Sequence, residues 1–310
     1  MESWNRWRLV EEITGTREKA IAWSQENGLL LRRVRCHQHR LDKAFKINRK
    51  AHGTFVCPRK QHRDYRQRET SAAQGTWFEG HRIDIHKMYS LMYSFANDDS
   101  YEQAMRESQV DARKCSMETI ADWYQYCREA IVERFLANQD VRAKIGGPGK
   151  IVQIDEAKFG SRKYERGRII EGHWVLGMIE KDSNKDLRLE ICPDHRRTAD
   201  VLIPLIKKHV APGTEIHTDS FKSYDRLDEH GYVHKKVNHN EEFVAGDGTH
   251  TQRIESCWRP IRARLRTRQV ARDRYADHIV EYQWRRWCRK NNKDLFQDLI
   301  DSIKDLYPIE

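Results

Sequence analysis

Apolar and polar residues follow two different periods along the chain, and the change of period divides it into regions. Up to residue 30 and again from 76 to 137, apolar side chains recur at helical spacing, and Lys144–Lys150 interrupts this pattern as a glycine-rich linker. From Ile151 onward, short β-branched or apolar runs predict strands and longer amphipathic stretches predict helices. The predicted strands are 151–155, 168–180, 187–192, 216–219 and 232–238, and the predicted helices are 198–209, 224–229, one around Glu255, and two between 275 and 307.

This order of three strands followed by alternating helices and strands is that of an RNase H-like α/β fold, the retroviral integrase superfamily, with a mixed five-stranded sheet. In that topology the first strand lies beside the strand that follows the first long helix. We therefore expect Asp155 and Asp219, each at the end of one of these strands, to be neighbours at the carboxyl edge of the sheet.

A third acid, Glu255, lies on a predicted helix beside its apolar face. Three carboxylates that converge on one point repel each other and are stable only around cations. Hard divalent ions such as Mg²⁺ take oxygen ligands, and two of them can hold the attacking and leaving oxygens of a phosphoryl displacement. The side chains of Asp155 and Glu156 point to opposite faces of the strand, so only one of the two can belong to this set of three carboxylates. The apolar run before Asp155 favours Asp155.

The charge of the chain is basic and unevenly distributed. There are 57 Lys and Arg against 47 Asp and Glu, and the segments Arg32–Lys50 and Arg259–Arg274 contain eight and seven of the basic residues, each with one acid. Charge runs are usually solvated helix faces. Because two of them flank a predicted phosphoryl-transfer site, we interpret them as surfaces for a polyanion such as DNA.

Two Cys/His pairs lie in the N-terminal basic region. Cys36 and His39 form C-x₂-H, and Cys57 and His62 form C-x₄-H. These ligand types at this spacing are typical of a structural zinc site. Two buried cysteines near surface histidines would give the same pattern, and the spacing alone leaves both interpretations open.

The helical stretch that follows is typical of a helix-turn-helix DNA-binding module, although a plain helical spacer would have the same periodicity. We expect four regions: 1–75, basic with a zinc-ribbon-like site; 76–145, helical and helix-turn-helix-like; 150–270, the RNase H-like catalytic domain; and 271–310, C-terminal helices.

No apolar run is long enough to span a membrane, and the first 28 residues lack a signal-peptide core, so we expect neither membrane association nor secretion. The seven cysteines are scattered and odd in number, which argues for reduced thiols. A DNA substrate then predicts the nucleus of a eukaryotic host, or otherwise the cytoplasm.

The chain resembles the Merlin-type DNA transposases and their bacterial insertion-sequence relatives, which carry a DDE catalytic domain. The resemblance covers roughly residues 150 to 268. It rests on residues 152–156 with Lys158, 217–219 with Tyr224, 237–239, and 250–251 with 254–256 and Trp258. Upstream, the family commonly has paired cysteines where this chain has Cys/His pairs, and it often has Asn where Gln252 stands.

The resemblance implies a cut-and-paste transposase in which Asp155, Asp219 and Glu255 hold two Mg²⁺ or Mn²⁺ ions for endonucleolytic cleavage and strand transfer. It implies binding of terminal inverted repeats and target DNA by a homodimer or higher oligomer, because two element ends must be paired. Candidate DNA contacts are Arg259, Arg262, Arg266 and Lys158. Two alternatives stay open: a domesticated DNA-binding protein without catalysis, and an RNase H-like nuclease.

Overall fold

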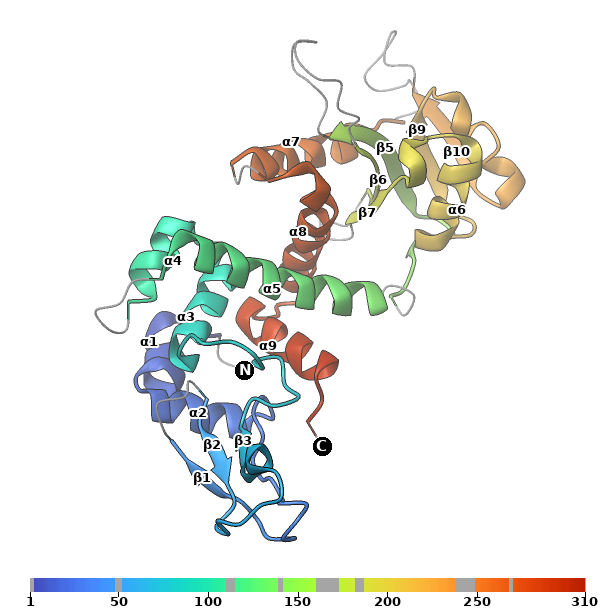
Figure 1. Cartoon of the computed structure of the whole chain (residues 1–310). Helices are drawn as coiled ribbons and strands as arrows, with labels where there is room; N and C mark the ends of the chain where they lie inside the picture. Colours follow the sequence, from blue (N-terminus) through green and yellow to red (C-terminus); the bar gives the residue numbers. More distant parts are fainter. Residues whose placement is uncertain are drawn as a thin grey trace. The chain divides into compact units, whose positions relative to one another are not determined.

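The computed structural model describes residues 3–47, 52–109, 115–138, 142–159, 173–181, 187–237, 249–267 and 270–309. The chain divides into two compact units (Figure 1). The first comprises Met1–Arg134 with Asn292–Glu310, and the second comprises Phe135–Asn291. The segment 271–310 is therefore shared between the units. Among the described helices, none combines the length and apolar character needed to cross a membrane.

The first unit combines helices with a small antiparallel sheet in the order β1-β2-β3. Its strands are β1 (Ala44–Lys46), β2 (Thr54–Val56) and β3 (Glu69–Ser71), with the 3-10 turn η2 (Tyr65–Arg68) before β3. Its helices are α1 (Arg6–Leu9), the π-helical turn η1 (Val10–Thr14), α2 (Arg17–Glu26), α3 (Ile85–Ala96), α4 (Tyr101–Glu107), α5 (Met117–Ala137, whose end extends into the second unit) and α9 (Leu295–Leu306).

Helix α3 is the centre of the first unit, and every one of its residues is buried, including Lys87. It packs against α2, α4 and α9. A helix enclosed in this way has no face to offer a DNA groove. Arg128, a basic residue on α5, is also buried and donates to Gln125, while the basic residues Arg113 and Lys114 lie outside the described residues. Neither α3 nor Arg128 therefore provides the exposed basic face with which a helix-turn-helix module would bind DNA.

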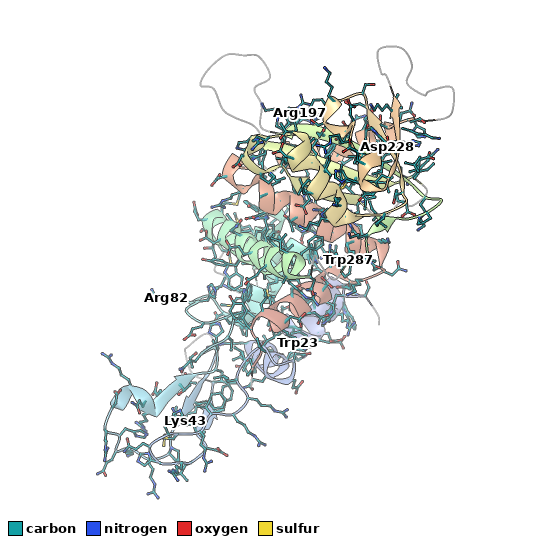
Figure 2. All side chains as sticks on the ribbon, turned by 90° about the vertical axis from the view of Figure 1, so that its right-hand side faces the viewer. Trp23, Lys43, Arg82, Arg197, Asp228 and Trp287 are labelled. Carbon is teal, nitrogen blue, oxygen red and sulfur yellow. The ribbon has the colours of Figure 1, made fainter. Side chains whose placement is uncertain are left out.

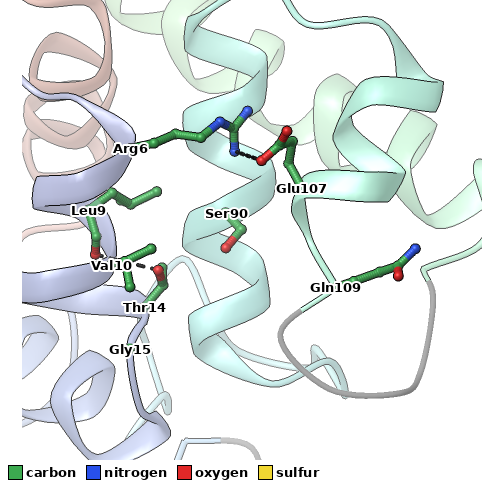
Figure 3. A pocket seen from close by; sticks show the side chains of 8 residues that line it. All are labelled: Arg6, Leu9, Val10, Thr14, Gly15, Ser90, Glu107 and Gln109. Carbon is green, nitrogen blue, oxygen red and sulfur yellow. Dashed lines mark hydrogen bonds and ion pairs between the residues drawn. The ribbon is translucent and has the colours of Figure 1, made fainter.

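A cavity of about 220 Å³ lies beside the π-helical turn (Figure 3). Gly15 follows the turn, and a Cβ there would come within 2.6 Å of the Val10 carbonyl oxygen, so a larger residue would be strained at this position. Arg6 crosses one side of the cavity and pairs with Glu107 at 3.2 Å and with Asp99 at 2.6 Å. The guanidinium thus joins α1 to α4 and to the segment between α3 and α4.

The second unit is built on a mixed five-stranded sheet in the order β10-β9-β5-β6-β7, which confirms the predicted mixed α/β architecture. β5 (Ile151–Phe159) pairs antiparallel with β6 (His173–Glu180), which pairs antiparallel with β7 (Leu187–Ile191). On its other side β5 pairs parallel with β9 (Glu215–Asp219), which pairs parallel with β10 (Val233–Val237). Residues 168–172 of one expected strand, and residues 238–239, lie outside the described residues.

The remaining elements cover the sheet and its edges. They are β4 (Ile145–Gly146), paired with β8 (Val210–Ala211), and the helices α6 (Ala199–His209), α7 (Gln252–Thr267) and α8 (Tyr275–Lys290). Short 3-10 turns stand at η3 (Pro193–His195), η4 (Lys222–Tyr224), η5 (Asp228–His230) and η6 (Arg272–Arg274).

The strand expected to end at Asp155 instead continues for four residues, so the prediction that Asp155 ends its strand was wrong. β6 pairs with β5 as far as Phe159, opposite His173, whereas β9 pairs only with Ile151–Gln153. The polar residues in the middle of β5 therefore mark a site on a long strand and not its end.

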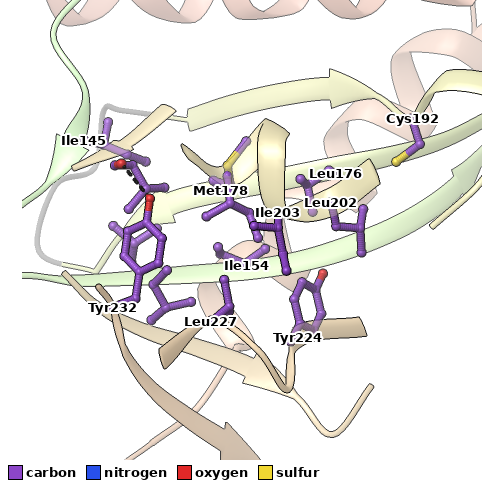
Figure 4. Close-up of a cluster of buried hydrophobic side chains, with 14 residues drawn as sticks. Ile145, Ile154, Leu176, Met178, Cys192, Leu202, Ile203, Tyr224, Leu227 and Tyr232 are labelled. Carbon is purple, nitrogen blue, oxygen red and sulfur yellow. Dashed lines mark hydrogen bonds between the residues drawn. The ribbon is translucent and has the colours of Figure 1, made fainter. Parts of the chain in front are cut away.

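Alternate residues of β5 serve two hydrophobic layers. Val152 and Ile154 pack with α6 and with Tyr224 in one cluster (Figure 4). Ala157 and Phe159 pack on the opposite face, where Trp258 of α7 joins a second cluster. The two helices thus cover opposite faces, and successive residues of β5 face different surroundings.

Helix α8 closes the sheet edge at β7. The Gln283 side chain accepts from the Leu189 amide and donates to the Leu189 carbonyl, both at 3.0 Å. It thus makes the two backbone hydrogen bonds that a neighbouring strand would make at this edge. Glu281, buried on the same helix, accepts from Arg264 of α7 at 2.5 Å and from Arg285 at 2.7 Å. This buried ion pair joins α7 to α8.

Candidate functional site

Three carboxylates meet near the middle of the sheet. Oxygens of Asp155 and Glu156 on β5 and of Asp219 at the end of β9 all lie within 4.8 Å of one another. The last β5–β9 pair is Gln153 opposite His217, and the same register continued by two residues brings Asp155 level with Asp219. The parallel pairing therefore explains why these two acids are neighbours.

Asp155 faces α7. The Trp258 indole Nε1 donates to its Oδ2 at 2.7 Å, from a side chain that is itself buried. Burial raises the pKa of Asp155, the Trp258 bond opposes that rise, and the charges of Asp219 and Glu255 add to it. The carboxyl group is thus held in one orientation in a site with excess negative charge.

Gly177 provides the space for this contact. It is the β6 partner of Asp155, and a Cβ at this position would lie 2.5 Å from the outer ring of Trp258 and 2.8 Å from Ile254. No side chain larger than hydrogen fits without displacing the indole. The glycine therefore lets α7 approach the sheet closely enough to reach the acid.

Glu156 faces the other way. The hydroxyl of Tyr224, fully buried in the α6 layer, donates to its Oε1 at 2.5 Å. Burial raises the pKa of Glu156 to about 7, and the charges of Asp219 and Asp155 also raise it, while the Tyr224 bond opposes the rise. Near neutral pH this carboxyl group therefore carries a proton for much of the time.

Glu255 lies at the start of α7, on the Asp155 side of the sheet. It is exposed, and the Thr251 hydroxyl donates to its Oε1 at 2.7 Å. Glu255 is not one of the three acids whose oxygens lie within 4.8 Å of one another, but its charge contributes to the raised pKa of Asp155. The structure thus brings two of the predicted acids into direct proximity and the third into electrostatic range.

Gln153 fixes the start of α7, a function that the sequence did not indicate. Its fully buried side chain accepts from the amides of Arg253 at 3.0 Å and Ile254 at 3.3 Å, and its Nε2 lies 3.1 Å from Nδ1 of His250. Free amides at a helix start need acceptors, and here a side chain of strand β5 accepts from two of them. Gln153 therefore sets the position of α7 relative to β5. It lies two residues before Asp155, and the Arg253 amide that it binds lies two residues before Glu255.

Arg197, labelled in Figure 2, is the second residue that sequence reasoning missed. Its guanidinium carbon lies 4.2 Å from the Trp174 ring centroid and 4.4 Å from that of Phe221. Its charge lowers the pKa of Glu156, which places the cation within electrostatic range of the acids. Arg197 lies between the edge strand β7 and helix α6. This position in the sequence is too general to identify Arg197 as a functional residue.

The predicted DNA contacts lie on two elements that also carry candidate acids, α7 with Glu255 and β5 with Asp155. Arg259, Arg262 and Arg266 are exposed and follow Glu255 at helical spacing along one stripe of α7. Lys158, exposed on β5, has its Nζ 5.7 Å from the Trp174 ring centroid. Arg264 is set apart from this stripe because it pairs with Glu281.

The two histidines near the acids have structural partners. His217 is almost fully buried, and its Nε2 lies 2.7 Å from Oε1 of Glu215. Nδ1 of His250 lies 3.1 Å from Nε2 of Gln153. These contacts agree with the structural function that is usual for a histidine beside a strand end.

The four Cys and His residues of the N-terminal region come together in the first unit. Sγ of Cys36 lies 3.4 Å from Nε2 of His62 and 3.6 Å from Nδ1 of His39, and Sγ of Cys57 lies 3.6 Å from the same His39 nitrogen. A tetrahedral zinc ion with usual bond lengths would separate sulfur and nitrogen ligands by about 3.6 Å. The observed spacings fit that value.

The electrostatics of this cluster also suit a metal. The pKa of Cys36 is lowered to about 6, and the largest cause is the backbone N–H of His39. Hydrogen bonds with His62 and Cys57 lower this pKa further, while burial raises it. A thiol that ionises so readily supplies the thiolate that zinc requires. All seven cysteines of the chain are buried thiols that form no disulfide.

Comparison with known proteins links the second unit to transposition. Residues 146–286 match the family model of the ISXO2-like transposase domain. An uncharacterized transposase-like protein from Haemophilus influenzae is 28% identical to this chain over 106 residues, which are 34% of this chain and 81% of that protein. The family match includes Asp155, Asp219 and Glu255 and excludes the Cys/His cluster. These similarities support a transposase, and they do not single out the Merlin type.

Proposed function

We propose that the protein is a DNA transposase whose second unit is an RNase H-like catalytic domain of the DDE type. The observation that carries the proposal is the meeting of Asp155 and Asp219 on adjacent parallel strands, with Glu255 on the helix that covers the same face. This arrangement lies within the region similar to a transposase domain. The proposed reaction is cleavage at the ends of a DNA element and joining of those ends to a target.

The donor set fits hard divalent cations. Asp155 and Asp219 offer only carboxylate oxygens, and the raised pKa of Asp155 reflects a cost of burial and repulsion that a bound cation would relieve. Asp155, Asp219 and Glu255 would hold two Mg²⁺ or Mn²⁺ ions. When bound, these ions would stabilise charge on the attacking and leaving oxygens of an in-line phosphoryl transfer.

The chain's own residues would orient and neutralise the DNA. Trp258 fixes the Asp155 carboxylate, and Gln153 fixes the helix that carries Glu255. The exposed stripe of Arg259, Arg262 and Arg266 continues from Glu255 and would bind backbone phosphates. We assign Glu156 a structural function, because Tyr224 binds it on the opposite face.

We propose that the first unit recognises the terminal inverted repeats, with a structural zinc ion at Cys36, His39, Cys57 and His62. Exposed basic residues flank the two cysteines, with Arg35 directly before Cys36 and Arg59 two residues after Cys57. Removal of zinc with a chelator, or the change Cys57→Ser, should release one equivalent of zinc and abolish specific end binding. Unchanged end binding in zinc-free protein would refute this assignment.

Two element ends must be paired, so the proposed active form is a homodimer or a higher oligomer. The proposed location is the compartment that contains the host DNA, which is the nucleus of a eukaryote and the cytoplasm of a bacterium.

The proposal is tested with a donor plasmid that carries the element's own flanking DNA. Wild-type protein with Mg²⁺ should release ends with free 3′ hydroxyl groups and join them to a second plasmid, while Asp219→Asn should bind the ends without cutting. End binding without cleavage by the wild type would instead favour a domesticated DNA-binding protein. Cleavage without regard to the flanking repeats would favour a nuclease.

A further inference from the structure

A pocket of about 200 Å³ lies in the first unit on the surface of α5, and none of the Cys/His cluster residues lines it. Three segments that are distant in the sequence converge on it: the loop before α3, one face of α5, and the residue that follows α9. Its lining residues are Trp77, His81, Tyr126, Glu129, Ala130, Glu133 and Tyr307. The α5 residues recur at spacings of three, four and seven, which is one helix face.

Four of the seven lining residues carry aromatic rings. The His81 ring centroid lies 5.2 Å from that of Tyr126 and 6.4 Å from that of Trp77. Trp123, which is only 2% exposed, packs behind them with centroid distances of 4.8 Å to His81 and 5.4 Å to Trp77. Tyr126 is 37% exposed and Tyr307 is 41% exposed, so ring surface remains open to a ligand.

Two exposed carboxylates complete the pocket. Glu129 accepts from the Gln125 amide at 3.0 Å, and in the described part of the chain no Lys or Arg pairs with Glu129 or Glu133. Burial lowers the pKa of His81, which favours the neutral form of its imidazole. The pocket therefore presents negative charge and π faces, with no cation of its own.

This combination selects the chemistry of the ligand. Aromatic walls attract cations through their π faces, and carboxylates attract them directly. A nucleobase could also stack on the rings, but the phosphate attached to it would meet Glu129 and Glu133. In a chain whose net charge is +10, an acidic aromatic pocket is also distinct from the basic surfaces expected to bind DNA.

We propose that this pocket binds an organic cation of the guanidinium or alkylammonium type. Two sources could supply such a group: an arginine or lysine side chain in a protein segment, or a free small cation. The proposal is independent of the transposase assignment, because none of the lining residues belongs to the acidic site or to the Cys/His cluster.

The test is ligand-observed NMR with the full chain and three probes: acetyl-Gly-Arg-Gly-amide, its neutral match acetyl-Gly-Gln-Gly-amide, and n-butylguanidinium. We expect saturation transfer to the arginine peptide and to butylguanidinium, and none to the glutamine peptide. Tighter binding of the peptide than of butylguanidinium would assign the site to a protein segment, and equal binding would assign it to free cations. Either result supports the proposal.

The matched variants are Glu129→Gln with Glu133→Gln, against Glu18→Gln with Glu102→Gln, which removes the same charge from exposed acids elsewhere in the unit. The first pair should weaken binding of the arginine peptide roughly fivefold or more, and the second should leave it unchanged. Equal loss in both pairs, or binding of the glutamine peptide, would overturn the proposal. Binding of thymidine monophosphate that Tyr126→Ala abolishes would overturn it in favour of a nucleobase platform.

Discussion

The indole of Trp258 donates a 2.7 Å hydrogen bond to Asp155 and thereby joins α7 to the middle of β5. Trp258→Phe keeps a ring in the hydrophobic layer but removes the donor. We expect affinity for Mn²⁺ to fall roughly tenfold, because the groups that orient a metal ligand typically contribute that much. Calorimetric titration measures this, with Trp284→Phe on α8 as a control that should bind as the wild type does. Equal affinity in Trp258→Phe would mean that the bond does not orient a ligand.

Gly177→Ala should force the Trp258 ring away from Asp155, because the added Cβ has a 2.5 Å approach to that ring. We expect a loss of about 1–3 kcal/mol in the free energy of unfolding, the usual cost of overpacking. The atoms of Trp258 that it meets are absent from phenylalanine. Gly177→Ala should therefore cost less stability in a Trp258→Phe background, and urea unfolding of the four proteins in this double-mutant cycle measures the difference. Equal costs in both backgrounds would refute the contact.

Gln153→Leu should leave the amides of Arg253 and Ile254 without their acceptor. The expected cost is about 1–3 kcal/mol for unsatisfied buried groups, together with faster hydrogen exchange in the first turn of α7. Exchange in α6, on the opposite face, should change no more than the global stability requires. A first turn that exchanged as slowly as in the wild type would show that α7 has another cap.

His52 should make the first unit sensitive to acid. Its side chain is buried, and burial is the main cause that lowers its pKa to about 4, with the charges of His81 and Arg17 adding to the effect. Because the unfolded chain binds this proton more readily, stability is retained above about pH 6.5 and is lost as the pH falls towards 4. From pH 7 to pH 5 the loss should be about 2 kcal/mol.

Urea unfolding of the wild type and of His52→Gln at both pH values isolates this effect, since the other titrating groups are common to both proteins. The wild type should lose about 2 kcal/mol more than the variant on acidification. Parallel losses in the two proteins would contradict the lowered pKa.

The order of strands and helices in the second unit could be predicted because each element has its own local period. The end of β5 could not, because its second half is fixed by pairing with β6, and only the tertiary structure reveals that pairing. A polar residue such as Asp155 within a strand looks, in sequence, the same as a residue beyond its end.

The candidate acids could be proposed from the sequence, but the residues that contact them in the structure could not. Trp258 lies 103 positions from Asp155, and their contact depends on the missing side chain of Gly177. Tyr224 binds Glu156, and Arg197 acts on its charge, because α6 and η4 pack on that face. No local spacing encodes contacts of this kind.

The central claim is that Asp155, Asp219 and Glu255 act together in Mg²⁺-dependent DNA cleavage while Glu156 does not. The most direct measurement compares end cleavage by Asp155→Asn, Asp219→Asn, Glu255→Gln and Glu156→Gln, with Asp228→Asn on the surface as a control, after checking that each binds the element ends. We predict a loss of about a thousandfold or more in rate for the first three variants and near wild-type rates for the other two. Cleavage retained by any of the first three, or lost in Glu156→Gln with end binding intact, would contradict the account.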